Sequence, residues 1–314
     1  MEGSAQQSRW TKRKLGARSK ALTPLRDAIR YAPMHQARTA ELSSKADALR
    51  QLHVEGPMLV LPNAWDAGSA RIFVQAGFPA LATTSAGIAF SLGYPDGERI
   101  SRDEMLAAVE RITRRISVPI TADMEAGYGQ TPDAVAETVR RVIDAGAVGM
   151  NLEDRIEEKH LIEFSLAVER VRAARRAADA AGVRLVLNAR TDAFEAPELP
   201  RDKRLAEAVR RGNAFREAGA DSVFVPFVGD RGTIEQVVQQ IRAPVNILGT
   251  PNAPTLKELA ALGVRRVTFG SAPMRATLGL VRRMAREWKE KGTYGTLEAY
   301  GIPFGELQQV FGNR

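Results

Sequence analysis

The segment ITADMEAGYGQTP, residues 120–132, places two acidic side chains at the end of an apolar run. Asp123 and Glu125 are separated by one residue, so on an extended strand they point to the same side. Crowded carboxylates raise one another's pKa unless a cation neutralises them. An all-oxygen cluster of this kind suits Mg²⁺ or Mn²⁺, with water filling the remaining coordination positions. The segment therefore indicates a divalent-cation site, and Glu153, which ends the next apolar run, is expected to complete it.

Polar residues also follow the other apolar runs of the chain. They lie in TTSAG (83–87), LGYPDGE (92–98), NLEDR (151–155), NARTDAF (188–194) and VNILGTPN (245–252). His35, His53 and His160 match no zinc spacing. Ser85 has neither the first glycine of a nucleophile elbow nor a histidine placed as its base, which argues against a serine hydrolase. The SAG turn is better suited to offer backbone N–H groups and a hydroxyl to a carboxylate.

The apolar runs alternate with amphipathic segments of helical length. The predicted strands are Met58–Leu61, Ala80–Thr83, Pro119–Ala122, Val148–Leu152, Arg184–Asn188, Ser222–Val225, Val245–Leu248 and Arg266–Phe269. Helix caps are expected at Asp66, Thr131 and Thr255, because a glycine closes each segment that follows. Eight strands alternating with helices predict an α/β fold, a (β/α)8 TIM barrel. A doubly wound sheet is disfavoured, because LPNAWDAG after the first run is no glycine-rich phosphate turn.

The composition excludes several classes of protein. Apolar residues make up 44% and charged residues 26%, and there is no cysteine, so disulfides, thiolate metal sites and a thiol nucleophile or acid are excluded. No apolar stretch is long enough to cross a membrane, and no signal peptide opens the chain. We expect a cytoplasmic protein without a membrane partner.

The net charge of +8 belongs to the N-terminal end of the chain. Residues 1–40 carry nine basic and two acidic side chains, whereas the other 274 carry 36 and 35. We predict a disordered basic extension over 1–40, with an RNA- or membrane-contacting arm or a targeting segment as alternatives. A nucleic-acid partner is not expected. The barrel should span 41–290, and the apolar segment 291–314 should dock on the barrel or on a partner subunit.

Four motifs together resemble the isocitrate lyase / phosphoenolpyruvate mutase superfamily over residues 50–290. They are NAWDAGSARIFVQAGFPALATTSAGIAFSLGYPDGE, ADMEAGYG, GMNLED and NARTDAF. The resemblance implies a Mg²⁺-dependent α/β barrel that makes or breaks C–C or C–P bonds beside a 2-oxo acid through an enolate-like intermediate. It also implies homodimers or homotetramers that exchange C-terminal helices between subunits.

The resemblance assigns roles residue by residue. Asp123 resembles the direct magnesium ligand, and Glu125 and Glu153 would act mainly through metal-bound waters. Arg190 resembles the arginine that grips the oxo and carboxylate oxygens of the substrate. The remaining assignments are Thr84, Ser85 and Ala86 as the turn that holds the substrate carboxylate, Asp96 as an aspartate near the reacting bond, and Asn246 as a substrate-side amide.

The departures from the family pattern narrow the expected reaction. Isocitrate and methylisocitrate lyases carry a cysteine acid in the loop after strand four, but here that stretch reads DRIEEKHLIEF (154–164). The mutase's long gating loop is also missing. We therefore expect a Mg²⁺-dependent carbon–carbon lyase on a short 2-oxo acid, resembling an oxaloacetate decarboxylase, with Asp96, Tyr94 and His160 as candidate proton carriers. The alternatives are phosphonopyruvate hydrolase or phosphoenolpyruvate mutase chemistry, and a non-catalytic 2-oxo acid binding protein.

Overall fold

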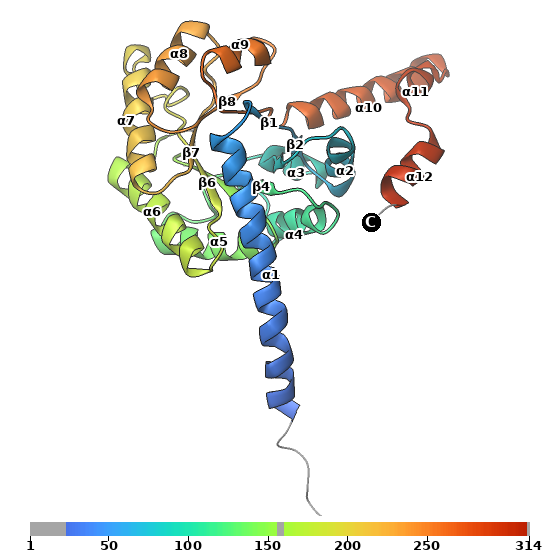
Figure 1. Ribbon diagram of the computed structural model, residues 1–314. Coiled ribbons are helices and arrows are strands. Elements are labelled where there is room, and N and C mark those ends of the chain that lie inside the picture. Colours follow the sequence, from blue (N-terminus) through green and yellow to red (C-terminus); the bar gives the residue numbers. More distant parts are fainter. Residues whose placement is uncertain (1–22, 156–159, 313–314) are drawn as a thin grey trace, which may run out of the picture. The chain divides into compact units, whose positions relative to one another are not determined.

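A parallel sheet forms the centre of the computed structural model, which describes residues 23–155 and 160–312. Within these residues its nine strands follow the order β1-β9-β8-β7-β6-β5-β4-β3-β2. Strands β1 (Leu59–Leu61) and β2 (Asn63–Ala64) lie at the two ends of this order, although only Pro62 separates them. Proline has no N–H to donate, so it interrupts one continuous strand. The sheet therefore closes into the predicted α/β barrel of eight strand segments (Figure 1).

The predicted strands are all present. Their bounds are β3 (Leu81–Thr83), β4 (Ile120–Asp123), β5 (Gly149–Glu153), β6 (Val186–Arg190), β7 (Ser222–Val225), β8 (Val245–Leu248) and β9 (Arg266–Thr268). Most of their residues are buried on both faces, because one side fills the barrel and the other packs against helices. This burial explains why the strands read as continuous apolar runs in the sequence.

Helices connect the strands and surround the barrel (Figure 1). They are α2 (Ala67–Gln75), α3 (Ser85–Ser91), α4 (Arg102–Thr113), α5 (Pro132–Asp144), α6 (Phe164–Ala180), α7 (Arg204–Glu217) after a 3-10 turn (Arg201–Lys203), α8 (Arg231–Gln240) and α9 (Leu256–Ala261). The side chains of Asp66, Thr131 and Thr255 each accept a hydrogen bond from a backbone N–H three residues further on. The three predicted N-caps are thus confirmed.

Helix α1 (Thr23–Val54) covers part of the predicted disordered extension. Backbone contacts divide the chain into Met1–Arg38 and Thr39–Arg314. Residues 23–40 belong to this helix in the structure. The disorder of the extension as a whole stays a prediction. Residues 1–22, where most of the basic side chains lie, are outside the described residues.

The C-terminal turns of α1 pack into the barrel domain through His53. Its Nδ1 lies 2.8 Å from the Leu49 carbonyl oxygen, and its Nε2 lies 3.3 Å from a guanidinium nitrogen of Arg266. A carbonyl can only accept, so Nδ1 carries the proton and Nε2 accepts from Arg266. Burial, and then the charge of Arg266, lower the pKa of His53 to about 3. The folded protein therefore keeps this histidine neutral.

This neutral histidine predicts a pH dependence of stability. The pKa of His53 is about 3 in the folded protein and 6.5 in the unfolded chain. Its contribution is present above pH 6.5 and is lost as the pH falls from 6.5 towards 3. The stability advantage of wild type over His53→Gln should shrink by about 1.4 kcal/mol per pH unit below 6.5, measured by urea unfolding between pH 7 and 5. His160→Gln, at an exposed histidine, is the control, and equal pH slopes for wild type and His53→Gln would refute this prediction.

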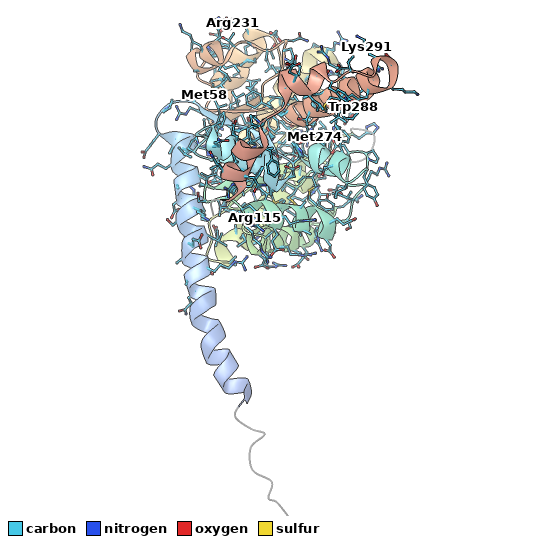
Figure 2. The ribbon with its side chains drawn as sticks, turned by 90° about the vertical axis from the view of Figure 1, so that its right-hand side faces the viewer. Met58, Arg115, Arg231, Met274, Trp288 and Lys291 are labelled. Atoms are coloured by element: carbon cyan, nitrogen blue, oxygen red, sulfur yellow. The ribbon has the colours of Figure 1, made fainter. Side chains whose placement is uncertain are left out.

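The chain ends in three helices, α10 (Ala272–Lys291), α11 (Gly295–Tyr300) and α12 (Phe304–Gly312). Met274 is the residue of α10 that is buried, whereas Trp288 and Lys291 extend from the helix (Figure 2). Helix α12 contacts α2, where the Arg71 guanidinium donates to the Val310 carbonyl. The segment thus touches its own barrel, and its exchange between subunits stays a prediction.

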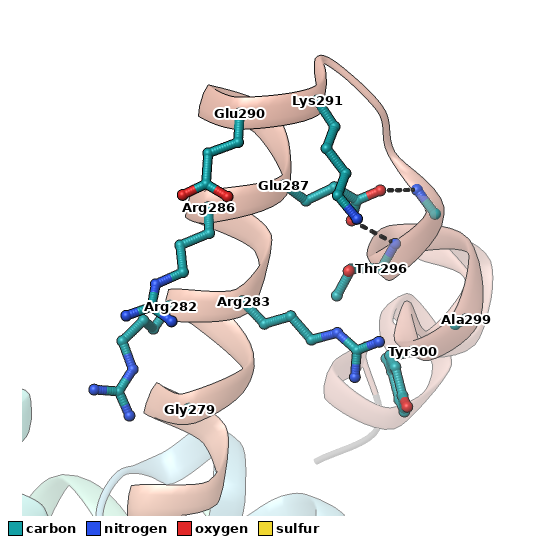
Figure 3. A pocket seen from close by; sticks show the side chains of 11 residues that line it. Gly279, Arg282, Arg283, Arg286, Glu287, Glu290, Lys291, Thr296, Ala299 and Tyr300 are labelled. Carbon is teal, nitrogen blue, oxygen red and sulfur yellow. Dashed lines mark hydrogen bonds between the residues drawn. The ribbon is translucent and has the colours of Figure 1, made fainter.

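Helices α10 and α11 are joined by Glu287, whose carboxylate accepts from the Gly295 and Thr296 backbone N–H groups at 2.7 and 2.9 Å (Figure 3). The two helices line a pocket of about 480 Å³ that contains none of the predicted site residues. No helix of the described residues is both long and apolar enough to span a bilayer.

Candidate active site

The predicted site residues lie at the carboxyl ends of neighbouring strands. Asp123 ends β4 and is paired in register with Asn151 of β5. Glu153 ends β5 opposite Arg190, and Arg190 ends β6 opposite Phe224 of β7. Parallel strands present these ends at one edge of the barrel, which is where barrel enzymes carry their chemistry.

The carboxylate of Asp123 is held by three donors. One oxygen accepts from the backbone N–H and the hydroxyl of Ser85, both at 3.0 Å. The other accepts from the Asn151 amide at 3.3 Å. Ser85 is the first residue of α3, and the Thr84 side chain caps that helix by accepting from the Gly87 N–H. The predicted TTSAG turn and the predicted metal-binding strand end therefore meet.

Asp96 joins this group from the loop after α3. The Ser85 hydroxyl lies 3.3 Å from the nearer carboxylate oxygen of Asp96. Burial raises the pKa of Asp96, and the negative charge of Asp123 raises it further. Asp96 is therefore protonated at a higher pH than an ordinary aspartate and can act as a proton donor.

Glu125 lies beyond the end of β4, so the alternation of side chains along a strand does not describe its position. Strand β4 ends at Asp123, and Glu125 adopts the left-handed backbone conformation with φ 50°. The expectation that the two acids share one strand face is therefore wrong. The Glu125 carboxylate accepts a hydrogen bond from the Glu98 N–H at 2.8 Å. Burial first, and then the charges of Asp96, Asp123 and Glu153, raise the pKa of Glu125 to about 8.

Non-glycine residues with left-handed backbone are concentrated around this edge. The described non-glycine residues with positive φ are Glu98, Glu125, Tyr128 and Phe227. Glu98 accepts from the Tyr128 N–H at 2.8 Å, so the loop after α3 and the loop after β4 are joined by reciprocal contacts. Each such conformation costs about 1 kcal/mol, and strain of this kind gathers at functional sites.

Glu153 and Arg190 form a buried ion pair. The two groups are 2.7 Å apart, and Arg155 lies 3.1 Å from the other oxygen of Glu153. Burial raises the pKa of Glu153, while the charge of Arg190 opposes the rise. Arg190 also donates twice to one oxygen of Asp192, at 3.0 and 2.6 Å. These contacts fix the orientation of the guanidinium.

Two aromatic rings flank Arg190. The ring centroids of Phe224 and Phe227 each lie 5.7 Å from its guanidinium carbon, within the range of cation–π contacts. Neither phenylalanine is a residue that the sequence reasoning identified. Phe224 was detectable as the register partner of Arg190, but the conformation of Phe227 leaves no signal beyond the preceding Pro226.

Three predicted residues stand apart from the acidic cluster in the described contacts. Tyr94 exposes 45% of its surface in the loop before Asp96. Asn246 is fully buried on β8, where its amide pairs with the Thr268 hydroxyl inside the barrel. His160 pairs with Glu198 at 3.1 Å and is exposed. Ala86, by contrast, lies in the first turn of α3 beside Ser85.

The side chains at this edge that could bind a metal ion all offer oxygen atoms. In the part of the chain that the structure describes, no three histidine or carboxylate side chains are arranged to hold an ion directly. Asp123 and Asp96 are bridged by one serine, whereas Glu125 and Glu153 are held by other partners. The arrangement is compatible with one direct carboxylate ligand, with the other acids acting through water.

A closed parallel barrel with acids and an oriented arginine at its carboxyl edge defines an enzyme of the (β/α)8 class. The family model described as phosphoenolpyruvate phosphomutase matches residues 49–289, so the chain belongs to the phosphoenolpyruvate mutase family. The resemblance seen in the four sequence motifs is thereby confirmed.

Three relatives illustrate the range of this family. The crystal structure of a Burkholderia cenocepacia J2315 protein described as a lyase/mutase aligns with TM-score 0.81 and 38% identity, over 87% of this chain and 98% of that one. The 2,3-dimethylmalate lyase of Eubacterium barkeri is 29% identical over 85% of this chain and 94% of its own length. The oxaloacetate decarboxylase of Bradyrhizobium diazoefficiens is 28% identical over 79% and 86%. The chain is an enzyme of the isocitrate lyase / phosphoenolpyruvate mutase type.

Proposed function

We propose that this enzyme is a Mg²⁺-dependent carbon–carbon lyase that acts on a short 2-oxo acid through an enolate, in the manner of an oxaloacetate decarboxylase. The observation that carries the proposal is the edge where Arg190 of β6, oriented by Glu153 and Asp192, is separated from the Asp123 carboxylate of β4 by a single intervening strand, β5. The similarity to an oxaloacetate decarboxylase and to a dimethylmalate lyase supports it.

A divalent cation fits the acids at this edge. Mutual repulsion contributes to the raised pKa values of Asp96 and Glu125, and a bound cation would offset that repulsion. Asp123 would hold Mg²⁺, or Mn²⁺, directly, and Glu125 and Glu153 would act through water. When bound, the ion supplies Lewis-acid polarisation of the oxo group of the substrate.

The chain's own residues would bind and orient the substrate. Thr84, Ser85 and Ala86, at the start of α3, would hold the substrate carboxylate, which would compete with Asp123 for the N–H and hydroxyl of Ser85. Arg190 would donate to the oxo oxygen and stabilise the negative charge that develops there. Because Glu153 and Asp192 already fix its guanidinium, little reorganisation is needed during the reaction.

The proton balance assigns a role to Asp96. When the carbon–carbon bond of oxaloacetate breaks, its electron pair enters the enolate and carbon dioxide departs. The enolate carbon then takes up one proton to give pyruvate. Asp96, with its raised pKa and its contact to Ser85, is the proposed donor. The contacts of His160 do not support it in this role, and Tyr94 contributes at most from the exposed loop.

A panel of 2-oxo acids tests the proposal. Purified protein with Mg²⁺ should convert oxaloacetate to pyruvate, and a coupled assay for pyruvate would measure this conversion. Excess chelator should abolish it. The family model is described as a phosphoenolpyruvate phosphomutase, which favours C–P chemistry as the second candidate. Phosphate or phosphoenolpyruvate formed from phosphonopyruvate, with oxaloacetate unchanged, would establish that alternative. Binding of oxalate with no product from any substrate would indicate a 2-oxo acid binding protein.

Assembly into homodimers or homotetramers stays a prediction, as does the cytoplasmic location.

A further inference from the structure

Phe227 has an unusual combination of backbone and side-chain features. It lies in the loop between β7 and α8, at the carboxyl edge of the barrel. Its φ is 64°, and 46% of its surface is exposed. The ring nevertheless lies 5.7 Å from the guanidinium carbon of Arg190. A large apolar side chain is thus presented to solvent beside the arginine proposed to contact substrate.

The backbone at Phe227 is one that glycine adopts without strain. A proline followed by a residue of positive φ is the arrangement of type II turns, which favour glycine at the second position. A phenylalanine there is a conformational outlier that a turn alone does not require. Such strain is maintained where a side chain serves a site.

The second ring gives the site one apolar side. Phe224 is buried on β7, and its ring also lies 5.7 Å from Arg190. Three of the five N–H groups of Arg190 are directed to Asp192 and Glu153, and Arg155 is paired with Glu153 as well. On the β7 side, an approaching group therefore meets aromatic carbon. A second carboxylate would lose hydration there, whereas an alkyl group would bury apolar surface.

We propose that Phe227 is a specificity-determining residue that forms, with Phe224, an apolar wall selecting 2-oxo acids that carry an alkyl substituent, besides any departing carboxylate, on the carbon next to the oxo group. The inference rests on the proposed function, because Arg190 is taken to contact the oxo oxygen. The rings beside its guanidinium then lie next to the substituents of the neighbouring carbon.

Binding of two unreactive probes tests the wall without relying on turnover. Pyruvate and 3-methyl-2-oxobutyrate differ by two methyl groups on that carbon, and their dissociation constants can be measured by calorimetry with Mg²⁺ present. Wild type should prefer 3-methyl-2-oxobutyrate, and Phe227→Gly should lower this preference by about 10-fold. The thermal unfolding temperature of Phe227→Gly should stay the same or rise, because glycine relieves the backbone strain.

Two further variants distinguish the effect of the apolar side chain from the effect of the strained backbone. Phe227→Leu keeps an apolar side chain in the strained conformation and should retain most of the preference. Phe227→Asn tolerates the left-handed backbone but is polar, and it should behave like Phe227→Gly. An unchanged ratio of the two dissociation constants in Phe227→Gly, or no preference in wild type, would overturn the inference. If the preference shifts as expected but no 2-oxo acid is converted, the wall is supported and the lyase proposal fails.

Discussion

Replacing Asp123 with asparagine should lower kcat/KM for oxaloacetate by about 10³-fold, since a lost metal ligand removes several kcal/mol of transition-state stabilisation. Asparagine keeps the shape of the side chain and can still accept from the Ser85 N–H, so the loop after β3 should keep its place. What is lost is the charge that would bind Mg²⁺ directly. Steady-state kinetics at increasing Mg²⁺, with the Mg²⁺ dissociation constant from calorimetry, measures both effects.

The matched control for this variant is Asp133→Asn. Asp133 is exposed in the first turn of α5, one loop away from Asp123. It should leave both turnover and Mg²⁺ affinity unchanged, while chelator added to wild type should reproduce the Asp123→Asn loss. Full activity and unchanged Mg²⁺ affinity in Asp123→Asn would refute the proposed metal site.

The barrel could be predicted because each strand and each helix start is determined by the residues of its own short segment. The apolar runs from Ser222–Val225 and Val245–Leu248 coincide with β7 and β8, because buried parallel strands need apolar residues on both faces. The interruption of the first strand at Pro62 was not predicted, although proline makes it intelligible afterwards. The helix over residues 23–40 was not predicted, because the positive charge of the extension was given more weight than helix propensity.

The site was predictable only where its residues stand at the ends of regular strands. Asp123, Glu153 and Arg190 end their strands, so strand register brings them to one edge whatever the loops do. Glu125 lies two residues beyond Asp123 on left-handed backbone, and a period-two pattern cannot describe that conformation. Asn246 lies within β8 rather than at its end, and its amide pairs with the Thr268 hydroxyl. Its role as a substrate-side amide stays a prediction.

The second large effect is expected at Arg190. Arg190→Met should lower kcat/KM for oxaloacetate by about 10³-fold, because the charge facing the developing enolate is lost. It should also lower the free energy of unfolding by about 3 kcal/mol, since it leaves the buried carboxylates Glu153 and Asp192 without this partner. Steady-state kinetics well below the unfolding temperature, together with urea unfolding, measures the two losses separately.

Arg175→Met is the control that separates catalysis from stability. Arg175 is a buried arginine on α6 that pairs with Asp221 at 2.5 Å and with the Leu185 carbonyl at 2.9 Å. Both partners precede strands, so this ion pair lies at the opposite edge of the barrel from Arg190. Arg175→Met should destabilise the protein to a similar degree yet retain turnover per folded molecule. Equal losses of turnover in the two variants would show that Arg190 supports the fold rather than the reaction. A guanidinium that only holds Glu153 and Asp192 in place would not stabilise the enolate itself.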